Sequence, residues 1–136
     1  MQAEILFVCV ENAGLSQMAQ AFAEKLGLKA SSAGTVPSGR VNPVVVETMR
    51  ERGIDLSGRS PRMLTSEMIR QPRLVVTMGC SVEEACSRPI LAAMQKKLVD
   101  WHLEDPKGRS IDEVRRIRDE IEKESARNCQ KRITVN

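Results

Sequence analysis

Short apolar runs separated by helical patterns constrain the fold of this 136-residue chain more than any other sequence feature. The clearest runs are EILFVCV at 4–10 and RLVVTM at 73–78, and weaker candidates are KASSAG at 29–34 and KKLVDW at 96–101. A continuous apolar run with β-branched members is typical of a strand that is covered on both faces. The sequence therefore predicts four strands, with 4–10 and 73–78 at the centre of a parallel sheet.

Helical patterns lie between these runs. Apolar residues recur four apart from Ser16 and stop at Gly27, and NPVVVETMRERG at 42–53 carries an Asn-Pro start and a final glycine. Residues 65–70 can form one or two helical turns. A capping box opens the helix predicted at 110–125, and we expect a frayed tail after it, from residue 127. The apolar face predicted for this last helix consists of Ile111, Val114, Ile117 and Ile121.

Strands that alternate with helices predict one α/β domain, residues 1–136, in which a four-stranded parallel sheet is flanked by helices. The net charge of +3, from 21 basic and 18 acidic residues, is too balanced to favour a nucleic-acid partner. No apolar run reaches the roughly 20 residues that span a membrane. The N-terminus carries no signal-peptide pattern, so we expect a cytoplasmic protein.

Four cysteines stand at positions 9, 80, 86 and 129. Their spacing lacks the paired pattern of a zinc site, and neither a metal nor a cofactor is predicted. Cytoplasmic cysteines are more often reactive or incidental than joined in structural disulfides.

Cys9 ends the first predicted strand, and a six-residue loop joins it to a helix that starts near Ser16. Backbone N–H groups and the dipole at a helix start favour a negative charge there, which stabilises a reactive thiolate. An unreactive strand-end cysteine before an ordinary turn explains the pattern equally well. The candidate anion-binding residues are Val10, Glu11, Asn12, Ala13, Gly14, Leu15 and Ser16.

The stretch LFVCVENAGLSQMAQAF resembles the signature loop of the low-molecular-weight protein tyrosine phosphatase superfamily, and is most similar to its thioredoxin-coupled arsenate reductase branch. The family pattern is a cysteine, five residues, an arginine and a serine. This chain has Cys9, VENAG, Leu15 and Ser16. The resemblance continues, in order, through SSAGT (31–35), ERGIDLSG (51–58), LVVTMGC (74–80) and DWHLEDPKG (100–108).

The resemblance implies that Cys9 attacks arsenate or a phosphate ester and that Asp105 is the general acid. It also implies that Cys80 and Cys86 complete a thiol–disulfide relay, which thioredoxin reduces. Without the resemblance, LEDP would be read as a solvated turn, with Glu104 as the rival acid, and the two later cysteines as incidental. It gives no role to Cys129.

Two further features separate the branches of the family. Family phosphatases place aromatic residues after the Asp-Pro pair, whereas here Lys107 and Gly108 follow, so a small tetrahedral oxyanion is the better substrate. Family members can also bind a monovalent cation with a helix glutamate. Gln20 occupies that position here, and potassium is therefore not predicted.

Leu15 replaces the arginine that grips two oxyanion oxygens in the family. Losing two charge-assisted hydrogen bonds, at about 1.5–3 kcal/mol each, lowers the rate by roughly 10² to 10⁴. Leu15 can be an engineered change, a natural one for which Arg40, Arg59 or Arg62 compensates, or a mark of lost catalysis. The predicted function is arsenate reduction. The alternatives are phosphotyrosine or small phosphate ester hydrolysis and non-catalytic anion binding.

Overall fold

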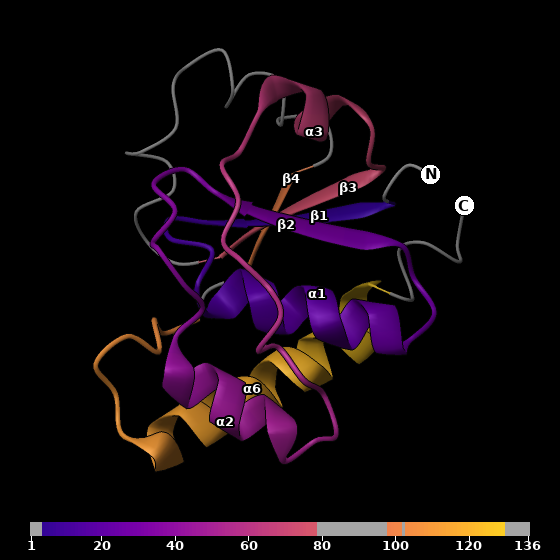
Figure 1. The fold of residues 1–136 in the computed structure, drawn as a ribbon. Coiled ribbons are helices and arrows are strands. Elements are labelled where there is room, and N and C mark those ends of the chain that lie inside the picture. The colour runs from indigo at the N-terminus through magenta and orange to yellow at the C-terminus, as the bar shows by residue number, and fades with distance from the viewer. Residues whose placement is uncertain (1–3, 79–97, 102, 130–136) are drawn as a thin grey trace.

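The computed structural model describes residues 4–78, 98–101 and 103–129. Four parallel strands form one sheet in the order β2-β1-β3-β4 (Figure 1). Their bounds are Ile5–Cys9 for β1, Ala30–Gly34 for β2, Leu74–Met78 for β3 and Leu98–Trp101 for β4. The predicted four-stranded parallel sheet is therefore confirmed, with the two most apolar runs as its central strands.

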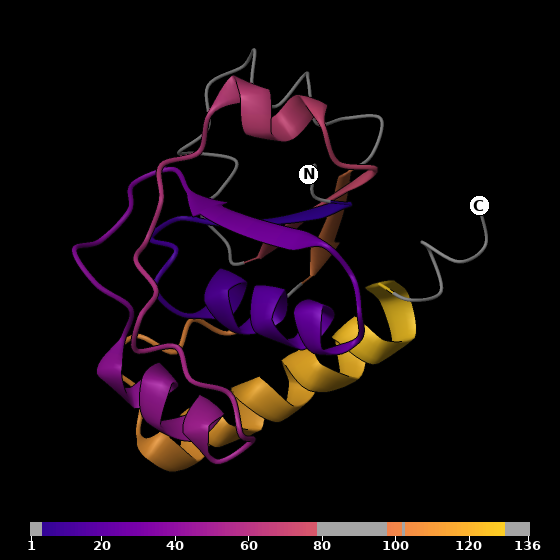
Figure 2. The ribbon, with the colours of Figure 1, turned by 45° about the vertical axis from the view of Figure 1, so that its right-hand side comes forward.

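Helices cover both faces of this sheet, as parallel strands require. Figures 1 and 2 show α1, α2 and α6 on one face and α3 on the other. Their bounds are Leu15–Lys25 for α1, Pro43–Arg50 for α2, Ser66–Arg70 for α3 and Ile111–Glu124 for α6. A π-helical turn, η2, follows α6 at Ser125–Cys129.

The core lies mainly between the sheet and the helices of the larger layer. All five residues of β1 are buried, since this strand has a neighbour on each side and helices on each face. Phe7 of β1 and Trp101 of β4 pack with ring centroids 5.7 Å apart. A smaller apolar cluster, which includes Leu6, Ile69 and Val75, contains residues of the sheet and of α3.

The predicted helix starts are confirmed by their capping bonds. The Asn42 side chain accepts a 2.9 Å hydrogen bond from Val44 N, and Ser110 Oγ accepts one of 3.3 Å from Glu113 N. Helix α1 begins at Leu15, one residue before the expected Ser16. Leu15 is thus the first residue of the helix, and its apolar side chain is buried.

The last helix corrects two sequence predictions. Ile111, predicted on the apolar face, is 37% exposed, whereas Arg118, which is outside that predicted face, is only 6% exposed. Arg118 is buried because α2 and its C-cap residue provide partners: its guanidinium donates to Thr48 O at 2.8 Å and to Glu51 Oε1 at 2.7 Å. The expected fraying from residue 127 is also wrong as far as residue 129, because η2 continues the helical path.

The parallel topology brings the carboxyl ends of all four strands to one edge of the sheet. Cys9, Gly34, Met78 and Trp101 are the last residues of the four strands. Cys80 and Cys86, together with the loop or short helix expected at 79–89, lie outside the described residues. Within the described ranges, no helix is long and apolar enough to cross a membrane.

Candidate active site

Cys9 stands at the carboxyl end of β1 with its side chain turned into a tight loop. The residue is 6% exposed. Its Sγ lies 2.8 Å from Ser16 Oγ and accepts a hydrogen bond from the Asn12 backbone N–H at 3.2 Å. Gly14, the N-cap of α1, has no side chain to cap the helix, so the first-turn N–H groups remain available to a negative charge.

Asn12 holds the loop in shape. It adopts the left-handed conformation, φ 53°, and is fully buried. Its Nδ2 donates to Ser16 Oγ at 2.7 Å, and its Oδ1 accepts from Gln17 Nε2 at 3.1 Å and from Arg62 N at 2.9 Å. Ser16 Oγ thus accepts from Asn12 while it also bonds to the sulfur of Cys9, and this linkage ties the loop to the cysteine.

Two glycines permit close contacts around the loop. A Cβ at Gly34 would lie 2.5 Å from Val10 O and 2.9 Å from Asn12 N. A Cβ at Gly14 would lie 2.6 Å from Pro106 Cγ. Gly34 therefore lets the end of β2 pack against the loop, and Gly14 lets the Asp-Pro segment lie directly over it.

The Asp-Pro segment reaches the loop from the far end of the chain. Pro106 is buried, and Asp105 Oδ1 accepts a 3.0 Å hydrogen bond from Lys107 N. Lys107 Nζ forms a 3.0 Å ion pair with Glu11 Oε2 of the loop. Glu104, the rival acid, also lines the cleft, and its Oε2 pairs with Arg116 at 3.3 Å and with Arg109 at 3.8 Å. Among the described contacts, Glu104 is held by two arginines, whereas Asp105 bonds to the backbone of Lys107.

The electrostatics of the site raise the pKa of the Cys9 thiol above its ordinary 9.0. Burial is the main cause, and the nearby Asp105 carboxylate adds to it. Hydrogen bonds from the Ser16 side chain and from the backbone of Ser16 and Asn12 act in the opposite direction. Among the described residues, no basic side chain bonds to the sulfur, which is consistent with leucine at position 15.

A cleft of about 860 Å³ opens above Cys9. Its walls are the loop, residues 38–43 and residues 103–109, with Met78 also contributing. Leu15 lines this cleft and also belongs to the main core. None of the described residues that line the cleft is aromatic, as expected from the sequence after the Asp-Pro pair.

The structure thus brings together Cys9, its loop and Asp105, which sequence patterns had singled out separately. Sequence reasoning missed Gln17, Pro106 and the ion pair of Lys107, whose partners are distant in the chain. Gln20 accepts a 2.6 Å hydrogen bond from Ser32. Across 4–78, 98–101 and 103–129, no three His, Cys, Asp or Glu side chains gather as a metal site would require.

Fold and site together define a class: a parallel α/β protein with a buried cysteine at the β1 end of the loop between β1 and α1 and an Asp-Pro segment packed against that loop. The model of the low molecular weight phosphotyrosine protein phosphatase family matches residues 4–134. The chain belongs to this family.

Two relatives in sequence and one solved structure are similar to this chain. A Halobacterium salinarum protein assigned to the arsenate reductases is 42% identical over 124 residues, which cover 85% of this chain and 83% of the relative. An arsenate reductase of Staphylococcus aureus is 36% identical over 120 residues, covering 86% and 88%. The structure of an arsenate reductase in the phosphate binding state has a TM-score of 0.79 and 32% identity, covering 93% of this chain and 95% of that one.

Proposed function

We propose that this protein reduces arsenate to arsenite, with the Cys9 thiolate as the group that attacks arsenic. The observation that carries the proposal is the placement of Cys9, supported by Ser16 and Asn12, beneath Asp105 in one cleft. The two relatives described above carry the name of arsenate reductases, which supports the same activity. A tetrahedral oxyanion is also the ligand class of the phosphate-bound neighbour.

In the first step, Cys9 Sγ forms a bond to arsenic and one arsenate oxygen leaves as water. The leaving oxygen needs a proton, and Asp105 is the acid that donates it. The loop N–H groups and the start of α1 stabilise the negative charge of the remaining oxygens.

In the second step, the thiolate of Cys80 attacks Cys9 Sγ. An S–S bond forms, the S–As bond breaks, and its electron pair reduces As(V) to As(III), which leaves as arsenite. Cys86 then attacks Cys80, which releases the Cys9 thiolate and moves the disulfide to Cys80–Cys86. Thioredoxin, an external dithiol, reduces that disulfide. Such a relay needs a reducing compartment, in agreement with the expected cytoplasmic location.

Leu15 reduces the activity without dismantling the site. The bonds among Cys9, Asn12 and Ser16 are all present with leucine at this position. Leucine lacks the guanidinium group that would bind two oxyanion oxygens, and the loss of those two hydrogen bonds lowers the rate by roughly 10² to 10⁴.

The test is arsenite production under thioredoxin recycling, comparing the present chain with Leu15→Arg, Cys80→Ser and Cys129→Ser. We expect Leu15→Arg to raise the rate at least about 100-fold. Cys80→Ser should abolish multiple turnover, whereas Cys129→Ser, the matched control, should leave it intact. No arsenite from either the present chain or Leu15→Arg would refute the proposal.

Phosphate ester hydrolysis is the second candidate. It is favoured by the family itself, whose name is that of phosphotyrosine protein phosphatases. The lack of aromatic side chains among the described cleft residues favours a small substrate over phosphotyrosine. Ester turnover that survives loss of Cys80 and Cys86, with no arsenite formed, would establish this function.

Leu15 itself favours a third candidate, a non-catalytic anion-binding protein. The loop retains its N–H donors but lacks the charged donor for a transition state. Phosphate binding without arsenite formation or ester turnover, in both the present chain and Leu15→Arg, would establish this role.

A further inference from the structure

The Cys9 loop lacks an internal positive charge, although an oxyanion brings at least one negative charge into it. Leu15 is 4% exposed and has no hydrogen-bond donor on its side chain. Backbone N–H groups provide directed donors but only partial charges. A side chain from outside the loop is therefore the natural place to look for a compensating cation.

Among the described residues, three cationic side chains line the cleft: Arg40, Lys107 and Arg109. Lys107 is already paired with Glu11 at 3.0 Å, and Arg109 lies 3.1 Å from Glu113. Within the described part of the chain, the Arg40 side chain forms neither an ion pair nor a hydrogen bond. Of these three described cations, Arg40 is thus the one whose charge is not already matched by a carboxylate.

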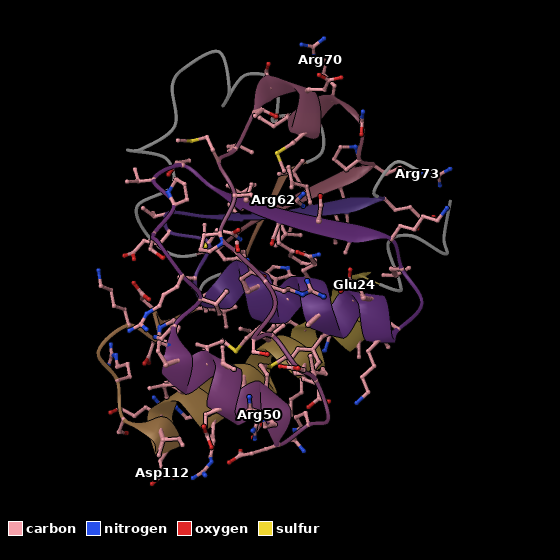
Figure 3. The ribbon with its side chains drawn as sticks, in the orientation of Figure 1. Glu24, Arg50, Arg62, Arg70, Arg73 and Asp112 are labelled. Carbon is pink, nitrogen blue, oxygen red and sulfur yellow. The ribbon has the colours of Figure 1, made fainter. Side chains whose placement is uncertain are left out.

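The other two arginines named from the sequence are placed differently. Arg59 binds Glu24 of α1 through its guanidinium. Arg62 borders a separate pocket beside Glu24 and Lys29, although its backbone N–H bonds to Asn12. Figure 3 labels Arg62 and Glu24 and shows neither near α2, whose start borders the cleft.

The backbone around Arg40 is fastened to the Cys9 loop. Val36 N donates to Val10 O at 2.8 Å, Ser38 N to Glu11 O at 3.0 Å, and Asn42 N to Ala13 O at 2.8 Å. Arg40 lies between the last two of these anchors.

Local bonds also limit the freedom of Arg40. Ser38 Oγ donates to its carbonyl oxygen at 2.9 Å, and the next residue, Val41, is buried. The Arg40 backbone is therefore held beside the loop while its side chain stays exposed and free to approach an anion.

The carboxylates of the cleft leave this charge available. Glu11 is paired with Lys107, and Glu104 lies 3.3 Å from Arg116 and 3.8 Å from Arg109. Asp105 is the third carboxylate among the described cleft residues, and its Oδ1 accepts a hydrogen bond from Lys107 N at 3.0 Å rather than from Arg40.

We propose that Arg40 supplies to the bound oxyanion the positive charge that Leu15 does not. This inference rests on the proposed function only in taking the Cys9 loop as the anion site. Arg40 acts from the β2–α2 connection, across the mouth of the cleft, rather than from inside the loop. Because the side chain is exposed, its contribution weakens as salt screens it.

The test measures the affinity of inorganic phosphate for the reduced protein, by its protection of Cys9 from alkylation. Cys80, Cys86 and Cys129 are replaced by serine in every variant, so that only one thiol reacts. The variants are Arg40→Ala, Arg40→Lys, Leu15→Arg and the double variant Leu15→Arg with Arg40→Ala.

Arg70→Ala is the matched control, since Figure 3 shows Arg70 on α3, across the sheet from α2. We expect Arg40→Ala to weaken phosphate binding at least tenfold when position 15 is leucine, and less than threefold when it is arginine. Arg40→Lys should recover part of the loss, and Arg70→Ala should change nothing.

Equal losses from Arg40→Ala in both backgrounds, or a loss no larger than that of Arg70→Ala, would overturn the inference. So would phosphate binding that is absent from the present chain and appears with Leu15→Arg. This outcome is separable from the reductase proposal. The expected binding pattern without arsenite production supports Arg40 and refutes the reductase, whereas arsenite production that Arg40→Ala leaves unchanged does the reverse.

Discussion

Replacing Gly14 by alanine tests the contribution of the Asp-Pro segment to the proposed reaction independently of that of Cys9. The added methyl group would lie 2.6 Å from Pro106 Cγ, about 0.8 Å short of the 3.4 Å at which ordinary contacts begin. Gly14 is held at the start of α1, whereas the Asp-Pro segment is tied to the loop by the exposed Lys107–Glu11 pair. The Asp-Pro segment is therefore the part that moves.

The size of the effect follows from this displacement. Overpacking by one methyl group costs about 1–3 kcal/mol in unfolding free energy, and alanine is also a poorer N-cap than glycine. We expect a total loss of about 2 kcal/mol. A shift near 1 Å in a reacting group lowers rates by roughly 10², so the acid-assisted step should slow about 30- to 100-fold.

The assay combines single-turnover arsenite formation, urea unfolding and the alkylation rate of Cys9. Alkylation is measured with the other three cysteines replaced by serine. Arsenite formation should fall as stated, while Cys9 alkylation stays within about twofold, because the sulfur keeps its bonds to Ser16 and Asn12.

Gly39→Ala is the matched control. Gly39 lines the same cleft, and a Cβ there would meet no atom within 4 Å. It should leave stability and arsenite formation nearly unchanged. Identical behaviour of Gly14→Ala and Gly39→Ala, or a parallel fall in Cys9 alkylation, would refute the reasoning.

Three further predictions follow from the described contacts. Ser16→Ala removes the 2.8 Å bond to Cys9 and should move the pH midpoint of Cys9 alkylation upward by about one unit; an unmoved midpoint contradicts this. The folded-state pKa of Cys9 is raised above 9.0, so its contribution to stability is complete below that pH and is lost as pH rises beyond it. In urea titrations at increasing pH, Cys9→Ala should therefore lose less unfolding free energy above pH 9 than the present chain. An equal decline of the unfolding free energy with pH in both proteins would argue against this. Arg118→Met removes the hydrogen bonds to the Thr48 carbonyl and the Glu51 carboxylate and should lower the unfolding free energy, measured in urea, by about 2 kcal/mol. A decrease under about 0.5 kcal/mol would show that the buried guanidinium contributes little to stability.

The fold was predictable because the strongest signals are local. The runs at 4–10 and 73–78 are mostly apolar, and they contain the buried central strands β1 and β3. Asn42 and Ser110 mark helix starts, because their side chains accept hydrogen bonds from the backbone of Val44 and Glu113, two and three residues later. Such signals need no knowledge of the rest of the chain.

The features that the sequence predicted wrongly, or did not predict, depend on contacts between residues far apart in the chain. Arg118 looks like part of a solvated face until Thr48, 70 positions earlier, offers its carbonyl oxygen. Lys107 pairs with Glu11 across 96 positions, and Pro106 packs on Gly14. These contacts exist only once α2, α6 and the Asp-Pro segment have been placed around the loop.

The fastening of residues 35–42 to the Cys9 loop has a consequence for the length of this connection. It joins β2 to α2, and Val41 is its one buried residue, so it has the appearance of a surface loop that tolerates insertions. Yet its N–H groups bond in sequence to the carbonyls of Cys9, Val10, Glu11 and Ala13. One residue added or removed would shift those bonds out of register, which makes this connection as intolerant of length change as a strand inside the sheet.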